Sequence, residues 1–268
     1  MSAWHKRKIS GVLLDITGVL YDSGPGGGTA IPGSLEAVKK LKSSGLSLRF
    51  CSNETTVTRK TLIEKLNSVG FSLSEAELFT PVPAVCKILK ERNLRPHLLV
   101  TNECLSDFST VDQNNPNCVV IADAETNFSY HNLNKAFQLL KSLDNPVLFS
   151  LGKGKYYKSG NDLVLDVGAY MKALEYSCDL QAEVVGKPEK SFFNTALKDM
   201  GLSADECVMI GDDIVGDVGG AQNAGMRGVQ VRTGKYRPED ENHSTVKADG
   251  VVDNLSQAVD LILAGQSS

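Results

Sequence analysis

Residues 11–23 read GVLLDITGVLYDS, and this stretch decides the fold. Its apolar run, residues 11–16, contains one acidic side chain, Asp15, and a glycine follows at Gly18. A short apolar run bounded in this way predicts a buried strand. A carboxylate at its carboxyl end predicts a ligand site, because ligands of open α/β sheets bind at those ends. Thr17 stands two residues after Asp15, where a second carboxylate would be expected.

The composition is that of an ordinary globular protein. Of its 268 residues, 41% are hydrophobic and 22% charged, which argues against disorder, and this length suits about two domains. The net charge of −4 gives no electrostatic reason to bind nucleic acid. The N-terminus lacks the apolar stretch of a signal peptide, and no segment approaches the ~20 apolar residues of a membrane span. We therefore expect a cytoplasmic protein, with the nucleus as a second location and no membrane partner.

The cysteines predict the redox state of the chain. All six stand outside CxxC pairs, and several lie in strand-like runs such as NCVVIAD and ECVMIGD. A disulfide framework is improbable at this chain length. We expect reduced thiols.

Short apolar runs alternate with helical patterns, which is typical of a parallel α/β sheet. One set of strand candidates occupies both ends of the chain: residues 11–16, 46–52, 182–186, 207–212 and 228–232. A second set lies between them: residues 97–100, 118–123 and 146–151, with a long helix over 132–143. The prediction is a Rossmann-like parallel-sheet core made of residues 1–82 and 184–268, with an α/β domain, residues 83–183, inserted into it.

Polar side chains stand at the ends of four strand candidates of the first set. They are Asp15; Ser52 and Asn53; Lys187; and Asp212, Asp213 and Asp217. Because parallel strands end at one edge of a sheet, we expect all four groups to face one pocket. Each alone could be an ordinary turn or loop cap, and the aspartates could merely match a helix dipole. Several carboxylates in a dry pocket would repel one another without a cation, and oxygen-only ligation favours Mg²⁺.

Four motifs carry a resemblance when they are taken in order: LLDITGV (13–19), FCSN (50–53), VGKP (185–188) and IGDDIVGD (210–217). Together they resemble the haloacid dehalogenase superfamily of aspartate-nucleophile phosphohydrolases. The resemblance covers the whole chain and includes a large α/β cap inserted between the second and third motifs. It implies that the inserted domain is that cap, leaning over the active site, and that the protein is a homodimer formed through it.

The resemblance also implies a role for each motif residue. Asp15 would be the nucleophile that forms an aspartyl phosphate, and Lys187 would be the second catalytic residue. Mg²⁺ would be held by Asp15, Asp212 and the backbone carbonyl of Thr17. Asp213 and Asp217 would lie next to the metal ligands and orient them. The substrate-binding set would comprise Asp15, Ile16, Thr17, Ser52, Asn53 and Lys187.

The threonine at position 17 limits which substrates the enzyme can cleave. An aspartate there would protonate the departing group, which threonine cannot do, so groups that leave without a proton are favoured. We expect a hydrolase of P–N bonds, as in phosphohistidine and phospholysine on small molecules or protein side chains, and of pyrophosphate. The alternative is a phosphate-binding scaffold that regulates partners without turnover. The presence of Asp15, Lys187 and Asp212 together favours the enzyme.

The sequence does not decide the function of two further stretches. GPGGG (24–28) lacks a phosphate-loop pattern, so we interpret it as a flexible loop beside the first motif. LGKGKYYKSG (151–160) places Lys153, Lys155 and Lys158 beside two tyrosines. A solvated basic hairpin and a substrate clamp explain that pattern equally well.

Overall fold

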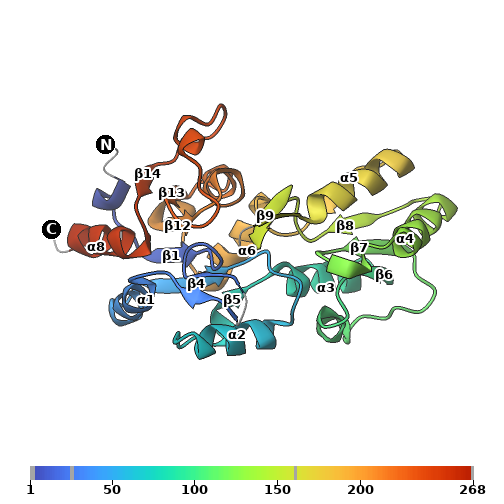
Figure 1. Ribbon diagram of the computed structural model, residues 1–268, viewed down its shortest axis with the longest axis horizontal. Coiled ribbons are helices and arrows are strands. Elements are labelled where there is room, and N and C mark those ends of the chain that lie inside the picture. Colours follow the sequence, from blue (N-terminus) through green and yellow to red (C-terminus); the bar gives the residue numbers. More distant parts are fainter. Residues whose placement is uncertain (1–3, 25–26, 160–161, 267–268) are drawn as a thin grey trace.

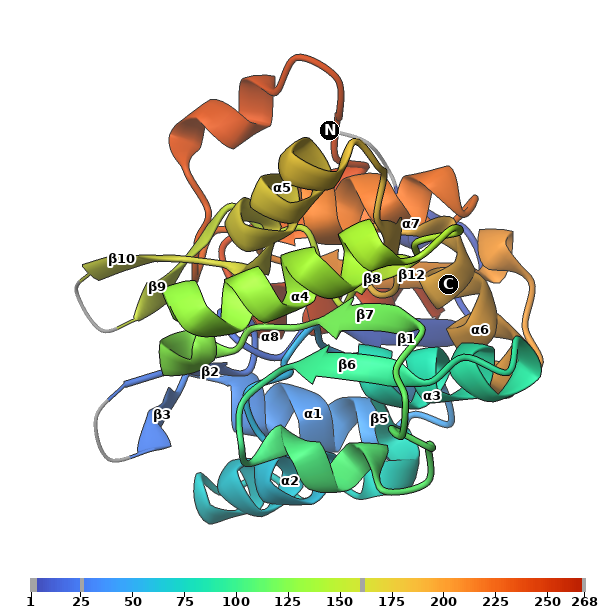
Figure 2. The same ribbon diagram turned by 90° about the vertical axis from the view of Figure 1, so that its right-hand side faces the viewer.

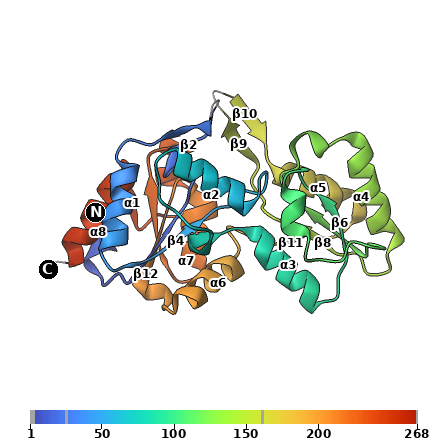
Figure 3. The same cartoon turned by 90° about the horizontal axis from the view of Figure 1, so that it is seen from below.

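The computed structural model of the chain describes residues 4–24, 27–159 and 162–266. Two lobes lie side by side in it, and Figure 1 and Figure 3 show them along the long axis. The core is the lobe that contains both termini, and the cap is the other lobe. Pro25 and Gly26 of the predicted flexible loop lie outside the described residues.

A six-stranded parallel sheet forms the centre of the core, which confirms the expected α/β class. Its strands, in spatial order, are β14 (Gly250–Val252), β13 (Arg227–Val231), β12 (Cys207–Gly211), β1 (Gly11–Leu14), β4 (Ser47–Cys51) and β5 (Leu78–Phe79). In register, Gly11 of β1 is opposite Cys207 on one side and Ser47 on the other. The carboxyl ends of the three central strands therefore lie next to one another.

Every side chain of β1 is buried because helices cover both faces of the sheet. Val12 and Leu14 pack in one cluster, and Leu13 packs in the cluster on the opposite face. The first cluster includes residues of α1 (Ser34–Ser43), α2 (Arg59–Ser68) and α8 (Leu255–Gln266). The second includes residues of α6 (Lys190–Met200) and α7 (Gly220–Asn223). Burial on both faces explains why β1 and β12 read as continuous apolar runs.

The cap has a four-stranded parallel sheet of its own, which faces the viewer in Figure 2. Its spatial order is β11 (Glu183–Val184), β8 (Leu148–Ser150), β7 (Cys118–Ile121) and β6 (Pro96–Leu99). One face packs on α3 (Pro81–Glu91) and the short helix η4 (Cys104–Phe108). The other packs on α4 (Tyr130–Ser142) and α5 (Val167–Cys178). The expected boundaries near residues 83 and 184 fall in α3 and β11.

Two antiparallel pairs complete the strands of the described residues. In the core, β2 (Tyr21–Asp22) pairs with β3 (Thr29–Ala30) beside the first motif. In the cap, β9 (Tyr156–Ser159) pairs with β10 (Asp162–Leu165). The stretch around Lys158 is therefore a hairpin, although the side chain of Lys158 lies outside what the structure describes.

One strand assignment from the sequence is wrong. The run at residues 182–186 was expected in the core sheet, but β11 pairs with β8 of the cap. Its two residues are exposed and half-buried, so it is a short edge strand rather than a buried core strand. Three groups of site residues therefore follow core strands, and Lys187 reaches them on the turn that leads from the cap back to the core.

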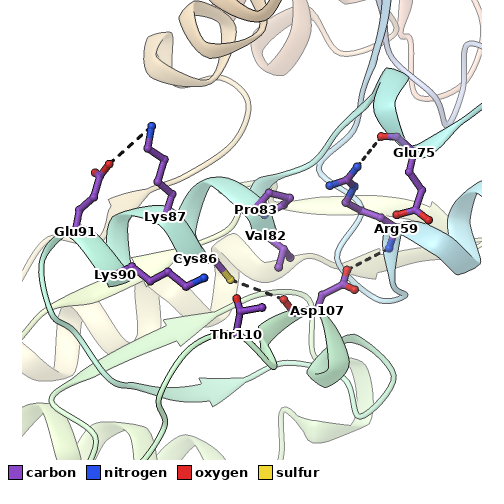
Figure 4. Close-up of a pocket in the computed structure, with 10 residues that line it drawn as sticks. All are labelled: Arg59, Glu75, Val82, Pro83, Cys86, Lys87, Lys90, Glu91, Asp107 and Thr110. Carbon is purple, nitrogen blue, oxygen red and sulfur yellow. Dashed lines mark hydrogen bonds and ion pairs between the residues drawn. The ribbon is translucent and has the colours of Figure 1, made fainter.

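The cap is attached to the core segment directly after Ser52 and Asn53. Thr101 donates to the carbonyl of Thr56 at 2.6 Å, and the backbone N–H of Asp123 donates to Thr55 Oγ1 at 3.2 Å. Figure 4 shows a third contact, in which Asp107 of the cap accepts from the backbone N–H of Arg59 at the start of α2, at 3.1 Å. These bonds hold the cap against the loop that follows the second motif.

The junction also has an open hollow of about 470 Å³ on its surface, and Figure 4 shows the residues that line it in close-up. Arg59 and Glu75 line it from the core, and Cys86, Lys90 and Asp107 line it from the cap. Its lining residues include none of the predicted phosphate-binding groups. It is thus a feature of the attachment between the lobes, separate from the site described below.

Two expectations about the whole chain can be compared with the structure. All six cysteines are free and buried, as expected for reduced thiols. Among the helices of the described residues, none combines the length and the apolar character that crossing a membrane requires.

Candidate active site

Asp15 lies directly beyond β1, where the loop after the strand begins. Its backbone N–H donates to the carbonyl of Ile210 at 2.9 Å, so the ladder between β1 and β12 fixes the base of the side chain. Gly18 has φ +87°, a conformation that costs a glycine little, and its N–H donates to Tyr21 at 2.8 Å. This turn leaves Asp15 at the edge of the sheet with 7% of its surface exposed.

Lys187 lies between two carboxylates. Its Nζ is 2.5 Å from Asp15 Oδ1 and 2.7 Å from Asp217 Oδ1, and all three residues are buried. Burial alone would lower the pKa of Lys187, but the charges of Asp15 and Asp217 outweigh it and raise that pKa. The site therefore contains a permanent cation in contact with the predicted nucleophile.

Asp15, Asp212 and Asp217 form a cluster in which one carboxylate oxygen of each lies within 4.8 Å of the others. Asp212 Oδ2 accepts the backbone N–H of Lys235 at 2.8 Å, whereas Oδ1 is buried and finds no partner among the described residues. Burial, then the charge of Asp15, raises the pKa of Asp217 to about 7 and that of Asp212 well above its ordinary value.

This arrangement fits a hard divalent cation. A buried carboxylate oxygen without a hydrogen bond is costly, and so is the repulsion among three buried carboxylates. A cation among them would relieve both costs, and ligands that are all oxygen suit Mg²⁺ better than a transition metal. Asp217 thus lies closer to the metal position than the sequence interpretation placed it.

Asp213 and Asp217, which were grouped together from the sequence, take different positions. The π-helical segment η7 (Ile214–Gly219) begins after Asp213. Asp213 Oδ1 caps that segment by accepting the N–H groups of Val215 and Gly216, and Oδ2 pairs with Lys235 Nζ at 3.1 Å. One turn later, Asp217 points back to the cluster, where its Oδ2 accepts the N–H of Asp213 at 3.1 Å.

Ser52 and Asn53 follow β4 at the same edge of the sheet. Ser52 Oγ accepts the N–H of Glu54 at 3.0 Å, which leaves the proton of the hydroxyl group to donate. Asn53 donates to the carbonyl of Lys187 at 2.8 Å and accepts the N–H of the same residue at 2.9 Å. The Asn53 amide therefore holds the Lys187 backbone from both sides, a positioning contact that the sequence did not reveal.

Ile16 and Thr17 form the turn after Asp15. The Ile16 side chain is fully buried, and its carbonyl accepts the N–H of Leu20 at 2.8 Å. Thr17 is half-buried and forms an isolated bridge with Tyr21. The residue at position 17 is therefore partly open to solvent.

Lys235 is the site residue that sequence analysis missed. It belongs to the loop after β13, in RTGKYRP (232–238), which contains no motif to single it out. Its backbone donates to Asp212 and its Nζ pairs with Asp213. Gly234 precedes it, and a Cβ there would lie 2.6 Å from Gly18 Cα and 2.0 Å from Asp212 Oδ2. The glycines at positions 18 and 234 were the sequence features that could have indicated this close approach.

Lys153 and Lys155, which precede the cap hairpin, lie in exposed positions. Lys153 forms an ion pair with Glu189 at 2.9 Å, and Lys155 is exposed. Both the solvated-hairpin and the substrate-clamp interpretations stay predictions.

Comparison with known proteins places the chain among its relatives. The profile of haloacid dehalogenase-like hydrolases matches residues 12–113, and a HAD-hydrolase-like profile matches residues 184–258. The phospholysine phosphohistidine inorganic pyrophosphate phosphatase of Bos taurus is 62% identical over 98% of this chain and 98% of its own. Among solved structures, 4-nitrophenylphosphatase from Thermotoga maritima has a TM-score of 0.86 at 25% identity, over 98% of this chain and 100% of that one. Glycerol phosphate phosphatase from Mycobacterium tuberculosis, in complex with magnesium, shares the fold with a TM-score of 0.81 at 16% identity. The match covers 95% of this chain and 77% of that one. The chain belongs to the haloacid dehalogenase-like hydrolases.

Proposed function

We propose that this chain is a Mg²⁺-dependent phosphatase that cleaves P–N bonds, as in phosphohistidine and phospholysine, and the P–O–P bond of pyrophosphate. The observation that carries the proposal is the buried group of Asp15, Lys187 and Asp212, in which a nucleophile touches a cation beside an unsatisfied carboxylate oxygen. The substrate class comes from the name of the Bos taurus relative at 62% identity and from the threonine at position 17.

The reaction has two displacements at phosphorus. In the first, an Asp15 oxygen bonds to phosphorus as the bond from phosphorus to nitrogen or bridging oxygen breaks, and the electron pair departs with the leaving group. In the second, water attacks the aspartyl phosphate, its proton passes to solvent, orthophosphate leaves and the carboxylate of Asp15 is restored. The ammonium of Lys187 and the hydroxyl of Ser52 stabilise charge on the phosphoryl oxygens in both steps.

Asp15 and Asp212 would hold Mg²⁺, together with the carbonyl of Thr17, and Asp217 stands in the same cluster. When bound, the ion supplies positive charge that lets a carboxylate approach an anionic phosphoryl group. Asn53 keeps Lys187 in place, and Asp213 caps the turn that carries Asp217.

The test of the function is phosphate release measured on four substrates at one free Mg²⁺ concentration and again without Mg²⁺. We expect release from phosphohistidine, phospholysine and pyrophosphate, with slower release from an alkyl phosphate. Phosphate binding without release from any of the four would support the regulatory scaffold instead.

Asp212→Asn is expected to raise the Mg²⁺ concentration needed for half-maximal activity. The amide keeps the size of the side chain but removes a charge from the ion-binding cluster. Loss of an outer partner of a metal ligand already costs about 10–100-fold in affinity, so loss of a ligand charge should cost at least about tenfold. Asp260→Asn, at an exposed position on α8, is the matched control. An unchanged Mg²⁺ titration would remove Asp212 from the ligand set.

Lys187→Met is expected to slow all substrates alike, because the ammonium contacts the phosphoryl group that they share. Loss of one donor to developing charge typically costs about 10²–10³-fold in kcat. Lys190→Met, three residues further on and exposed, is the control. A loss confined to one substrate would move Lys187 to a role at the leaving group.

The homodimer stays a proposal, and one surface supports it. In the cap hairpin, Leu163 is 60% exposed and Leu165 57%, on a two-stranded sheet whose outer edges are free to pair in the described part of the chain. Exposed apolar side chains on an edge strand favour association with a second copy. The expected location, cytoplasm and nucleus, also stays a prediction.

A further inference from the structure

Lys235 is a second cation at the active site, and its environment differs from that of Lys187. Lys187 is 6% exposed, and its ion pairs with Asp15 and Asp217 use two of its three donors, which leaves one for the transferred phosphoryl group. Lys235 makes one ion pair, with Asp213 at 3.1 Å, and 36% of its side chain is exposed. An ammonium group has three donors, so Lys235 can bind an incoming anion while it remains near Asp213.

The backbone around Lys235 fixes where that ammonium group stands. Thr233 donates to the carbonyl of Gly18 at 2.5 Å, and Gly234 packs against Gly18 with no room for a Cβ. The N–H of Lys235 then binds Asp212 at 2.8 Å. The loop is thus wedged between the nucleophile turn and the expected metal ligand, and its lysine side chain extends from there toward solvent.

The cap faces the same region. Asp166 precedes α5 and is half-buried. Burial raises its pKa; the hydrogen bond from the Val167 N–H and the charge of Lys235 partly offset this, and the charges of Glu54 and Asp213 reinforce it. Lys235 therefore lies within electrostatic reach of both lobes. A leaving group departs from phosphorus roughly in line with, and opposite to, the attacking Asp15 oxygen.

We propose that Lys235 binds the departing phosphate of pyrophosphate and so sets the preference for this substrate over neutral leaving groups. The inference rests on the proposed function. A departing phosphate carries about −1.5 to −2 charge at neutral pH, by analogy with a phosphoryl group on a side chain. Acidic neighbours such as Asp213 would repel it without a cation, whereas a neutral imidazole needs no such partner. Lys235 acts on the leaving group, and Lys187 acts on the phosphoryl group that is transferred.

The experiment compares pyrophosphate with phosphoimidazole, whose leaving group is neutral and carries no carboxylate. For Lys235→Gln we expect kcat/KM on pyrophosphate to fall about 10-fold to 100-fold, the range for one hydrogen bond between charged groups. On phosphoimidazole we expect a change below about threefold, since no such bond is lost. Lys235→Arg should recover most of the loss, and Lys40→Gln, a remote exposed lysine paired with Asp260, should change neither rate. Free Mg²⁺ is held equal because pyrophosphate also binds the ion.

A binding measurement separates this role from a structural one. In the Asp15→Asn background, titration calorimetry should show that Lys235→Gln weakens pyrophosphate about 10-fold or more, with orthophosphate changed far less. The proposal would be overturned if Lys235→Gln lowered kcat/KM equally on pyrophosphate and phosphoimidazole, or left kcat/KM on pyrophosphate unchanged. It would also be overturned if the substitution weakened the binding of pyrophosphate and of orthophosphate equally. If Lys235→Gln does not fold, Lys235→Met takes its place in both measurements, and the same outcomes decide the proposal. A wild type that hydrolyses neither substrate would refute the proposed function, while the binding comparison would still test Lys235.

Discussion

Asp15→Asn is expected to abolish turnover on every substrate while the fold stays intact. The amide is almost the same size as the carboxylate but cannot form the aspartyl phosphate. Removal of a catalytic nucleophile typically lowers kcat by about 10⁴-fold to 10⁶-fold. Stability should change little, because Lys187 keeps Asp217 as a partner and one repelling carboxylate leaves the cluster. Phosphate release and thermal unfolding without Mg²⁺ measure the two effects.

Two further measurements make the Asp15→Asn result specific. Acid quenching during turnover should trap phosphorylated protein from the wild type and none from the variant. Asp22→Asn, at an exposed position in the adjoining β2, should keep the wild-type rate. Residual hydrolysis near the wild-type rate in Asp15→Asn would rule out the covalent route, and a melting temperature lowered by more than about 3 °C would show that the substitution costs stability as well.

The parts of the fold that could be predicted are those in which local pattern and burial agree. Residues 11–14 form a strand buried on both faces, so their sequence is apolar throughout and the strand is evident. The same holds for Cys207–Gly211, whereas Arg227–Val231 is equally buried but includes Arg227 and Gln230. Because each strand is followed by polar side chains, the edge of the sheet where Asp15 and Asp212 meet also followed from the sequence.

The misassigned strand shows where pattern alone is insufficient. Glu183–Val184 is a short edge strand, and an apolar run of this length fits either sheet. Its partner, β8, is decided by long-range packing that the local sequence does not encode. Lys187 still reaches the site because Asn53, which follows a core strand, binds its backbone.

Contacts between distant segments explain the remaining differences. Lys235 stands in a stretch of turn residues, and its role depends on Asp212 and Asp213, more than twenty residues earlier in the chain. Asp217 looked equivalent to Asp213 in sequence, since both follow the same strand. The π-helical segment between them turns one carboxylate toward Lys187 and leaves the other as a helix cap.

Thr17 has the second large expected effect, because it determines which leaving groups can depart. An alkoxide is about as basic as hydroxide, whose conjugate acid has a pKa of about 15.7, so it needs a proton as it leaves. Imidazole leaves as a neutral molecule once its other ring nitrogen has taken a proton from solvent, which a pKa of about 6.5 allows near neutral pH. Phosphate, with a second pKa of roughly 6, can leave as an anion. The lysine amine is more basic, but a phosphoramidate can take a proton from solvent on its nitrogen before the bond breaks.

The position can accept an acid. Thr17 is half-buried, so a carboxylate there would keep part of its hydration. It would add a fourth acid near Asp15, Asp212 and Asp217, which is a reason to compare variants at saturating Mg²⁺. The backbone turn at Gly18 does not depend on the side chain at position 17, since Gly18 supplies the positive φ.

Thr17→Asp is therefore expected to raise alkyl phosphatase activity relative to pyrophosphatase activity, by up to the roughly 10²–10⁴-fold that a general acid–base group contributes. Thr17→Asn is the matched control, because asparagine has the size of aspartate but cannot act as a general acid or base. The ratio of kcat/KM on an alkyl phosphate to kcat/KM on pyrophosphate, followed in all three proteins, measures the effect. If aspartate and asparagine gave the same ratio as threonine, position 17 would matter only through its backbone carbonyl. The preference for P–N and P–O–P bonds would then have to arise from charged groups elsewhere at the site, such as Lys235, which pairs with Asp213.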